Sequence, residues 1–140
     1  MIIDTNVVSE IMRPVPNAKV ADWFERTAQM ARFITSVTEA ELLFGVELMP
    51  EGKRRDTFAL VIERLIKFDL PQPVLPFESA DAPYCAKISA LRRRAGRPIS
   101  IFDAQIAAIA LRRGLSIATR NIRDFEGCGV TLINPWDPAP

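Results

Sequence analysis

The chain has 140 residues, of which 49% are hydrophobic and 25% are charged. This length fits one domain with a buried core, so we expect a single domain over residues 1–140 and exclude a largely disordered chain. No apolar run reaches the roughly 18 residues that a membrane-spanning helix needs. The first residues meet Asp4 without a basic segment, so we expect no signal peptide and predict a cytoplasmic protein.

The absence of histidine limits the chemistry. The sequence contains no histidine, and its two cysteines, Cys85 and Cys128, lie far apart. Mechanisms with a histidine base and histidine-ligated metals are therefore excluded, and the cysteine spacing indicates neither a zinc motif nor a disulfide framework. A metal site in this chain would use oxygen ligands, which favours Mg²⁺ or Mn²⁺.

The formal net charge is only +1, but the charges are unevenly distributed. Residues 85–125 contain nine basic and two acidic residues, whereas residues 1–84 contain nine basic and 13 acidic residues. Most of the bases in 85–125 are arginines, which form forked contacts with phosphate. Two interpretations stay open, namely solvated helix faces and a surface for nucleic-acid phosphates, for which the candidates are Arg93, Arg97, Arg120 and Arg123.

Short apolar runs and helical patterns alternate along the chain. In chain order we expect a strand over 1–3, helices over 7–12 and 17–28, a strand over 32–35, helices from Ser36 or Thr38 to 49 and over 53–68, a strand over 74–75, helices from Ser79 to 94 and from Ser100 to 113, and strands over 116–118 and 131–133. This alternation indicates the α/β class, with a mainly parallel central sheet and helices on both faces.

Polar residues follow two of the predicted strands. Asp4 and Asn6 come after the first strand, and Thr119, Asn121 and Asp124 come after the strand over 116–118. In open α/β sheets the functional crevice lies beyond the carboxyl ends of the strands, so these residues are candidates for a site. The structural alternatives are that Asp4 caps a helix and that the stretch from Thr119 is a simple turn.

Two further acids stand on predicted helices. Glu41 lies at the edge of an expected apolar stripe formed by Val37, Ala40, Phe44 and Leu48, and Glu39 is its rival. Asp103 follows Ser100 at the spacing of a capping box, beside an expected core stripe of Ile99, Phe102, Ile106 and Ile109. Taken together, the separated acids in an arginine-rich chain favour a carboxylate-lined Mg²⁺ site that faces a phosphate substrate.

At these residues the chain closely resembles the PIN-domain ribonucleases, and among them the VapC-type toxins of bacterial toxin–antitoxin pairs. The matching stretches are 4–10, 36–42 with Gly45, 96–103, 118–125 and 134–136. Each motif is short, but their joint order and spacing are specific and extend from residue 1 to 136. The resemblance implies a three-layer α/β/α fold and a metal-dependent endoribonuclease.

The resemblance also implies the roles of single residues. Asp4, Glu41 and Asp103 match the acids of the family, and Glu41 is favoured over Glu39 because the family's acid directly precedes a leucine. For the fourth position some members have an acid where this chain has Asn121, and others use the acid three residues later, so we take Asp124. Asn6, Thr119 and Asn121 are then neutral polar helpers. The charge pattern, and not the resemblance, makes the four arginine candidates the expected RNA contacts.

The partners that the resemblance implies are an RNA substrate, a small antitoxin and a second copy of the chain, possibly within a larger toxin–antitoxin assembly. Operator DNA is expected only through the antitoxin, and no membrane is involved. The alternatives are an RNA-processing PIN nuclease outside such a pair and a non-catalytic RNA-binding PIN domain. A phosphoacceptor receiver domain fits less well, because the paired acids after the first strand and a late lysine are missing.

Overall fold

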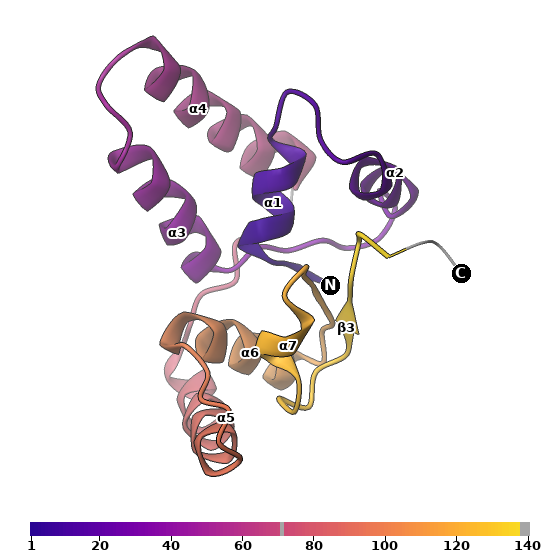
Figure 1. The fold of residues 1–140 in the computed structure, drawn as a ribbon, viewed down its shortest axis with the longest axis vertical. Coiled ribbons are helices and arrows are strands. Elements are labelled where there is room, and N and C mark those ends of the chain that lie inside the picture. The colour runs from indigo at the N-terminus through magenta and orange to yellow at the C-terminus, as the bar shows by residue number, and fades with distance from the viewer. Residues whose placement is uncertain (71, 138–140) are drawn as a thin grey trace.

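The computed structural model describes residues 1–70 and 72–137 (Figure 1). Its parallel sheet has the order β1-β2-β3, formed by Ile2–Ile3, Ile117–Ala118 and Leu132–Ile133. Two isolated parallel bridges, Ile2 with Phe33 and Thr35 with Leu75, lie beyond β1. The strands predicted over 32–35 and 74–75 are thus reduced to bridging residues. Pro73 and Pro76 flank Leu75 and cannot donate a backbone hydrogen bond, which limits pairing there.

Seven α-helices and two short turns surround the sheet within the described ranges. They are α1 (Thr5–Ile11), α2 (Ala18–Arg26), α3 (Ser36–Glu47), α4 (Lys53–Arg64), the π turn η1 (Leu65–Asp69), the 3₁₀ turn η2 (Ser79–Asp81), α5 (Ala82–Arg94), α6 (Ile101–Arg113) and α7 (Ile122–Phe125). The predicted helix over 53–68 is therefore α4 continued by a π turn. Helix α7 was predicted only as a turn, because four residues carry little helical periodicity.

The sheet separates two hydrophobic cores. Ile2 and Ile117 contribute to the core that includes α5 and α6, whereas Ile3 and Ala118 contribute to the core that includes α1 to α4. Successive strand residues point to opposite faces, so each two-residue strand supplies one side chain to each core. In Figure 1, α3 and α4 lie towards one end and α5 and α6 towards the other, and α3 contacts α6 where the two cores meet. The predicted three-layer α/β/α architecture is confirmed.

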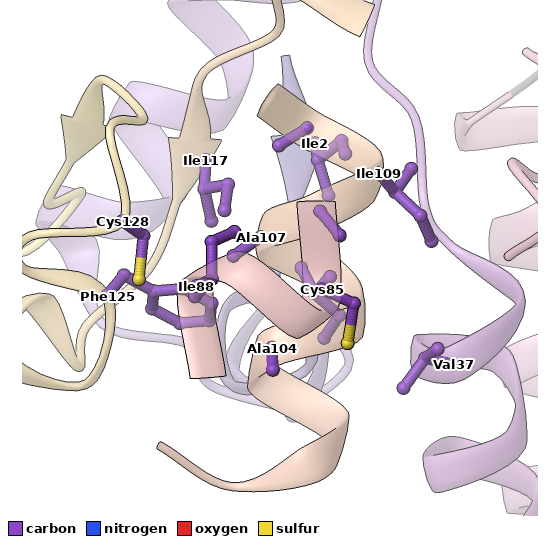
Figure 2. Packing of buried hydrophobic residues seen from close by; sticks show 13 residues of the cluster. Ile2, Val37, Cys85, Ile88, Ala104, Ala107, Ile109, Ile117, Phe125 and Cys128 are labelled. Carbon is purple, nitrogen blue, oxygen red and sulfur yellow. The ribbon is translucent and has the colours of Figure 1, made fainter. Parts of the chain in front are cut away.

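Small side chains let α6 lie close to its neighbours. Ala104 and Ala107 are fully buried on α6, and Figure 2 shows Ala107 beside the side chains of Ile88 and Ile117. Both cysteines are free and buried in this same core, where Figure 2 labels Cys85 and Cys128. Burial raises the pKa of each thiol, so these residues act as small hydrophobic side chains.

Two helices begin at their expected capping positions, since Asn17 caps α2 and Ser100 caps α6. The helix expected from Ser36 or Thr38 is capped by Thr35. The Asp4 side chain caps α1, which consequently begins at Thr5 and not at residue 7. Ser79 does not cap the next helix: the backbone N–H of Glu78 donates to Asp81 Oδ2 at 2.8 Å, and η2 precedes α5.

The buried face of α3 differs from the predicted one. The residues that are buried are Val37, Thr38, Leu42 and Val46, whereas the predicted Ala40, Phe44 and Leu48 are exposed. The helix is apolar on nearly every side, so spacing alone could not select the face that meets α1 and α4. On α6 the predicted Ile106 and Ile109 are buried, but Phe102 is 53% exposed.

In the described part of the chain, the structure has no helix that is both long and apolar enough to cross a membrane.

Candidate active site

Asp4 stands where β1 ends and α1 begins. Its backbone N–H donates to the carbonyl of Ala118 at 3.0 Å, which fixes it at the edge of the sheet. The side chain is 5% exposed. Its Oδ1 accepts from the Thr5 backbone N–H at 2.8 Å, and its Oδ2 accepts from Asn6 Nδ2 and Thr119 Oγ1, each at 2.7 Å. Asp4 is therefore both the cap of α1 and the most tightly held carboxylate of the site.

The polar residues after β2 connect to Asp4 through Asn6. Asn6 Nδ2 also donates to Thr119 Oγ1 at 3.1 Å, and Asn6 Oδ1 accepts from the Arg120 backbone N–H at 3.1 Å. Thr119 is fully buried and accepts from the Asn121 backbone N–H at 3.0 Å. The structure thus brings Asn6 and Thr119 to the carboxylate, whereas Asn121 takes part through its backbone.

Glu41 joins the site from α3. Thr5 Oγ1 donates to Glu41 Oε1 at 2.8 Å, and Thr5 directly follows Asp4. For Glu39 no hydrogen bond to these residues is found in the described ranges, so the contacts favour Glu41. Sequence reasoning did not assign Thr5 a role, although its position next to Asp4 marked it as a polar neighbour of the site.

Asp103 enters from the first turn of α6. Ser100 Oγ donates to Asp103 Oδ2 at 2.7 Å and accepts from the Asp103 backbone N–H at 3.1 Å. The capping role that the spacing predicts is therefore real, and the half-buried carboxylate still acts on the other acids. Asp124 lies exposed on α7.

Burial and the charges of neighbouring acids raise the pKa values of Asp4 and Asp103. Burial raises the pKa of Asp4 to about 6, the bonds from Thr119 and Thr5 oppose this, and the charges of Asp103 and Glu41 add to it. Burial also raises the pKa of Asp103, where the Ser100 bond lowers it and the Asp124 charge raises it. The four predicted acids therefore lie within electrostatic reach of one another, in a chain from Glu41 through Asp4 and Asp103 to Asp124.

The chemistry of these donors suits a hard divalent cation. All candidate ligands are carboxylate oxygens, and a cation among them would offset the burial and repulsion that raise the pKa of Asp4. Among the residues described, no three acidic, cysteine or histidine side chains already converge into a cage for an ion. The acids are instead oriented one by one by Thr5, Ser100 and Thr119.

Several of the arginines within residues 85–125 have a structural role. Arg92 is 7% exposed, and its guanidinium donates to the carbonyls of Arg97, Arg123 and Glu126. Arg112 and Arg113 form ion pairs with Glu78 and with Asp81, which is fully buried. Because these arginines are already bonded within the protein, fewer basic side chains are free to bind phosphate than the charge of residues 85–125 suggests.

The four predicted phosphate-binding arginines differ in their surroundings. Arg97 forms an ion pair with Glu126 at 2.6 Å, which competes with a contact to phosphate. Arg93, Arg120 and Arg123 are exposed and have no ion-pair partner within residues 1–70 and 72–137. Arg123 flanks Asp124 on α7, and Arg120 directly follows Thr119, so both lie next to the acids.

Known proteins resemble this chain over nearly its whole length. The PIN domain family model matches residues 1–127. A plasmid stability protein, StbB, of Pseudomonas syringae is 39% identical over 98% of this chain and 99% of its own length. Toxin FitB of Neisseria gonorrhoeae is 33% identical over 97% of this chain and 98% of its own length.

Comparison of structures leads to the same group. The complex FitAB bound to a DNA fragment contains a chain that is similar with a TM-score of 0.91 and 31% identity, covering 99% of this chain and 97% of that one. The relatives therefore match the chain in sequence, in length and in fold.

Proposed function

Because the chain belongs to the PIN-domain family, we propose that it is the ribonuclease toxin of a toxin–antitoxin pair. It folds as a single domain and hydrolyses RNA phosphodiester bonds at the carboxylates around Asp4. The observation that carries the proposal is the setting of Asp4: it is buried, it is held by Asn6 and Thr119, and its pKa is raised by the charges of Asp103 and Glu41. Relatives that match the full chain are named toxins and ribonucleases.

We assign the binding of Mg²⁺, with Mn²⁺ as the other candidate, to Asp4, Glu41, Asp103 and Asp124. A bound ion of this kind polarises a phosphate and lowers the pKa of a water molecule. The protein's own contribution is to orient the carboxylates. Asn6 and Thr119 bond one oxygen of Asp4, Thr5 bonds Glu41, and Ser100 bonds Asp103. Residues that orient ligands in this way strongly affect metal affinity.

Asp124 is the better candidate for the fourth acid. Its charge raises the pKa of Asp103, whereas the Asn121 side chain is exposed and takes part only through its backbone N–H. Exchange of Asp124 for Asn should therefore impair cleavage more than exchange of Asn121 for Ala.

The test is cleavage of single-stranded RNA and tRNA with Mg²⁺ or Mn²⁺, against the same reactions with EDTA. We expect metal-dependent cuts from the wild type and loss of most of the rate in Asp103→Asn, because a ligand carboxylate is removed while the Ser100 cap can persist. Asp56→Asn is a matched control, since Asp56 also lies in the first turn of a helix, α4, but away from the site. Full activity of Asp103→Asn would contradict the site assignment.

The proposed protein partner is a small antitoxin. A groove at the ends of α1 and α3 and along α4 is lined by apolar side chains that include Met12, Leu48, Phe58 and Val61. Leu48 is 69% exposed in the isolated chain. Exposed apolar patches of this kind mark surfaces that a protein partner covers. Solved relatives are complexes of toxin and antitoxin with DNA. We therefore extend the proposal to a larger assembly that contacts operator DNA through the antitoxin. The same proposal includes a homodimer of this chain.

A further inference from the structure

A pocket beside the carboxylates is used neither by the core nor by the proposed chemistry. It has a volume of about 290 Å³, and the residues that matter in its lining are Glu10, Arg13, Pro16, Asn17, Arg120 and Trp136. This volume is near the lower limit, roughly 300 Å³, of small-molecule pockets. The lining combines an aromatic ring, two guanidinium groups and a carboxylate, which are the groups that recognise unstacked bases and phosphates of RNA.

The pocket adjoins the carboxylate site along α1. Asn6 and Glu10 lie four residues apart on this helix, a separation of about 6 Å along its axis. The backbone N–H of Arg120 donates to Asn6 Oδ1 at 3.1 Å, and Asn6 Nδ2 donates to Asp4 Oδ2 at 2.7 Å. An RNA strand with one phosphate at the carboxylates therefore has a neighbouring nucleoside within reach of the pocket.

Arg120 and Trp136 offer a surface for stacking. The Arg120 guanidinium lies 5.3 Å from the centroid of the Trp136 ring, within the cation–π range of about 6 Å. Trp136 is half-buried and packs against the core of α1 to α4, which holds its ring in place. Arg120 has no acidic ion-pair partner in the described ranges. Bases stack on aromatic rings and on guanidinium planes of this kind.

Glu10 supplies a polar acceptor in the same pocket. Its Oε1 accepts from the Asn17 backbone N–H at 2.7 Å, and its Oε2 accepts from Arg13 at 3.3 Å. The bond from Asn17 holds the pKa of Glu10 below its usual value, so the group is ionised at neutral pH. A carboxylate has about four acceptor positions, and these two bonds leave capacity for the amino group of a base.

We propose that this pocket binds one nucleoside of the RNA strand next to the cleaved phosphate, with its base stacked on the Arg120–Trp136 pair and its amino edge at Glu10. This inference rests on the proposed function, because it takes RNA to be the substrate. It makes Trp136 a positioning residue that fixes the strand and takes no part in bond cleavage.

The two tryptophans of the chain allow a direct test by fluorescence. Trp23→Phe leaves Trp136 as the single tryptophan, and Trp136→Phe leaves Trp23, which lies on α2 outside the pocket lining. Both variants are made in the Asp103→Asn background, so that a mixed-sequence single-stranded RNA is cut too slowly to change during the titration. We expect the RNA to quench the emission of Trp136 and to leave that of Trp23 unchanged. Bound RNA with no quenching of Trp136, or with equal quenching of both residues, would overturn the assignment.

Kinetics on otherwise wild-type protein provide the second measurement. Trp136→Ala should raise KM about tenfold with little change in kcat, as expected for the loss of one stacked base, and Trp136→Phe should restore most of the affinity. Trp23→Ala is the matched control for loss of a half-buried tryptophan, because Trp23 packs against the same core but lies outside the pocket. Recovery of a low KM in Trp136→Phe would show that stacking on the ring is what Trp136→Ala loses. Circular dichroism of Trp136→Ala tests separately for a folding defect.

The outcomes separate this inference from the proposed function. If the wild type cuts no RNA with either metal and binds none, both are wrong. If the wild type cuts RNA and Trp136→Ala has an unchanged KM, the pocket assignment alone is wrong. If the antitoxin changes the emission of Trp136 and RNA does not, the pocket is a protein contact and the nucleoside assignment is wrong.

Discussion

Asp4 is both a helix cap and a candidate site residue. Its side chain caps α1, and the same carboxylate is the centre of the candidate site, 5% exposed and bonded to Thr119 across the sheet edge. A buried carboxylate near other acids is costly to ionise, and here burial raises its pKa to about 6. The protein without a metal therefore carries an unfavourable charge at neutral pH that a cation would relieve.

This charge predicts a pH dependence of stability in EDTA. The pKa of Asp4 is about 6 in the folded state and near its ordinary value of 3.8 in the unfolded state, so the folded state binds the proton more tightly. The resulting stabilisation is present below the unfolded pKa and is lost as the pH rises through 6. Between pH 4 and 7, Asp4→Asn should gain roughly 2 kcal/mol in unfolding free energy relative to the wild type, because most of the difference between the two pKa values falls inside this window.

Urea unfolding of both proteins at the two pH values measures this difference. Asp22→Asn serves as the control, since Asp22 is exposed on α2. Mg²⁺ should stabilise the wild type at pH 7 more than Asp4→Asn, because the ion binds only the folded site. Parallel pH profiles of the wild type and Asp4→Asn would show that Asp4 titrates normally.

The acids of the candidate site could be picked out from the sequence, but their contacts could not. Asp4 and Asp103 could each be a helix cap or a candidate site residue, and the structure shows that each one bonds at the start of a helix while its pKa is raised by a neighbouring acid. The bond from Thr5 to Glu41 joins residues 36 positions apart, and no local pattern encodes a contact at that separation. The ion pair between Arg97 and Glu126 could not be predicted from the sequence for the same reason, since the two residues lie 29 positions apart.

At the scale of elements, Arg92 connects α5 to the segment that carries Asp124. Its guanidinium donates to the carbonyls of Arg97 at 2.7 Å and Arg123 at 3.2 Å, and to that of Glu126. Arg92→Leu would leave these carbonyls without their donor, so we expect a loss of about 3 kcal/mol in unfolding free energy. Because α7 would also be released, cleavage should fall.

The matched control is Arg94→Leu, two residues further along α5. Arg94 is exposed, so its exchange should change the unfolding free energy by no more than about 0.5 kcal/mol. Urea unfolding with equal midpoints for both variants would show that the carbonyl contacts of Arg92 contribute little.

The types and order of the elements could be predicted well, and the orientation of one helix could not. The alternation of strands and helices is strongly marked by capping residues such as Asn17 and Ser100. On α3, by contrast, apolar residues occur on nearly every side, and Phe44 is 63% exposed although its spacing from Val37 fits a buried stripe. Which face is buried is decided by α1 and α4, and these contacts are not local in sequence.

At the scale of the whole molecule, the apolar groove predicts how inhibition can be separated from catalysis. Leu48→Asp should weaken inhibition by the antitoxin and leave cleavage by the free protein unchanged, because Leu48 lines the groove and, among the described residues, is not one of those that bond the carboxylates. Met30→Asp is the control, since Met30 is 54% exposed and lies outside the groove. Undiminished inhibition of Leu48→Asp would place the antitoxin on another surface.

The difference between paired and unpaired arginines predicts how RNA binding depends on salt concentration. Arg93 and Arg123 have no ion-pair partner among the described residues, whereas Arg97 is paired with Glu126. Removing both Arg93 and Arg123 should reduce the slope of log K against log salt concentration by about 1.4, and Arg97→Ala should change it less. The slope is measured on Asp103→Asn, which does not consume the RNA. An unchanged slope would assign Arg93 and Arg123 to solvated helix faces.

The contact between Asp4 and Thr119 spans 115 positions of sequence. On the ribosome the first acid of the site is made early and its hydroxyl partner late, and β1 cannot pair with β2 until Ile117 has also emerged. Translation is slower than the closing of such contacts, so assembly of the site waits until Ile117 and Thr119 have left the ribosome. A nascent chain that has not reached these residues therefore cannot cut the message or the ribosome that produces it.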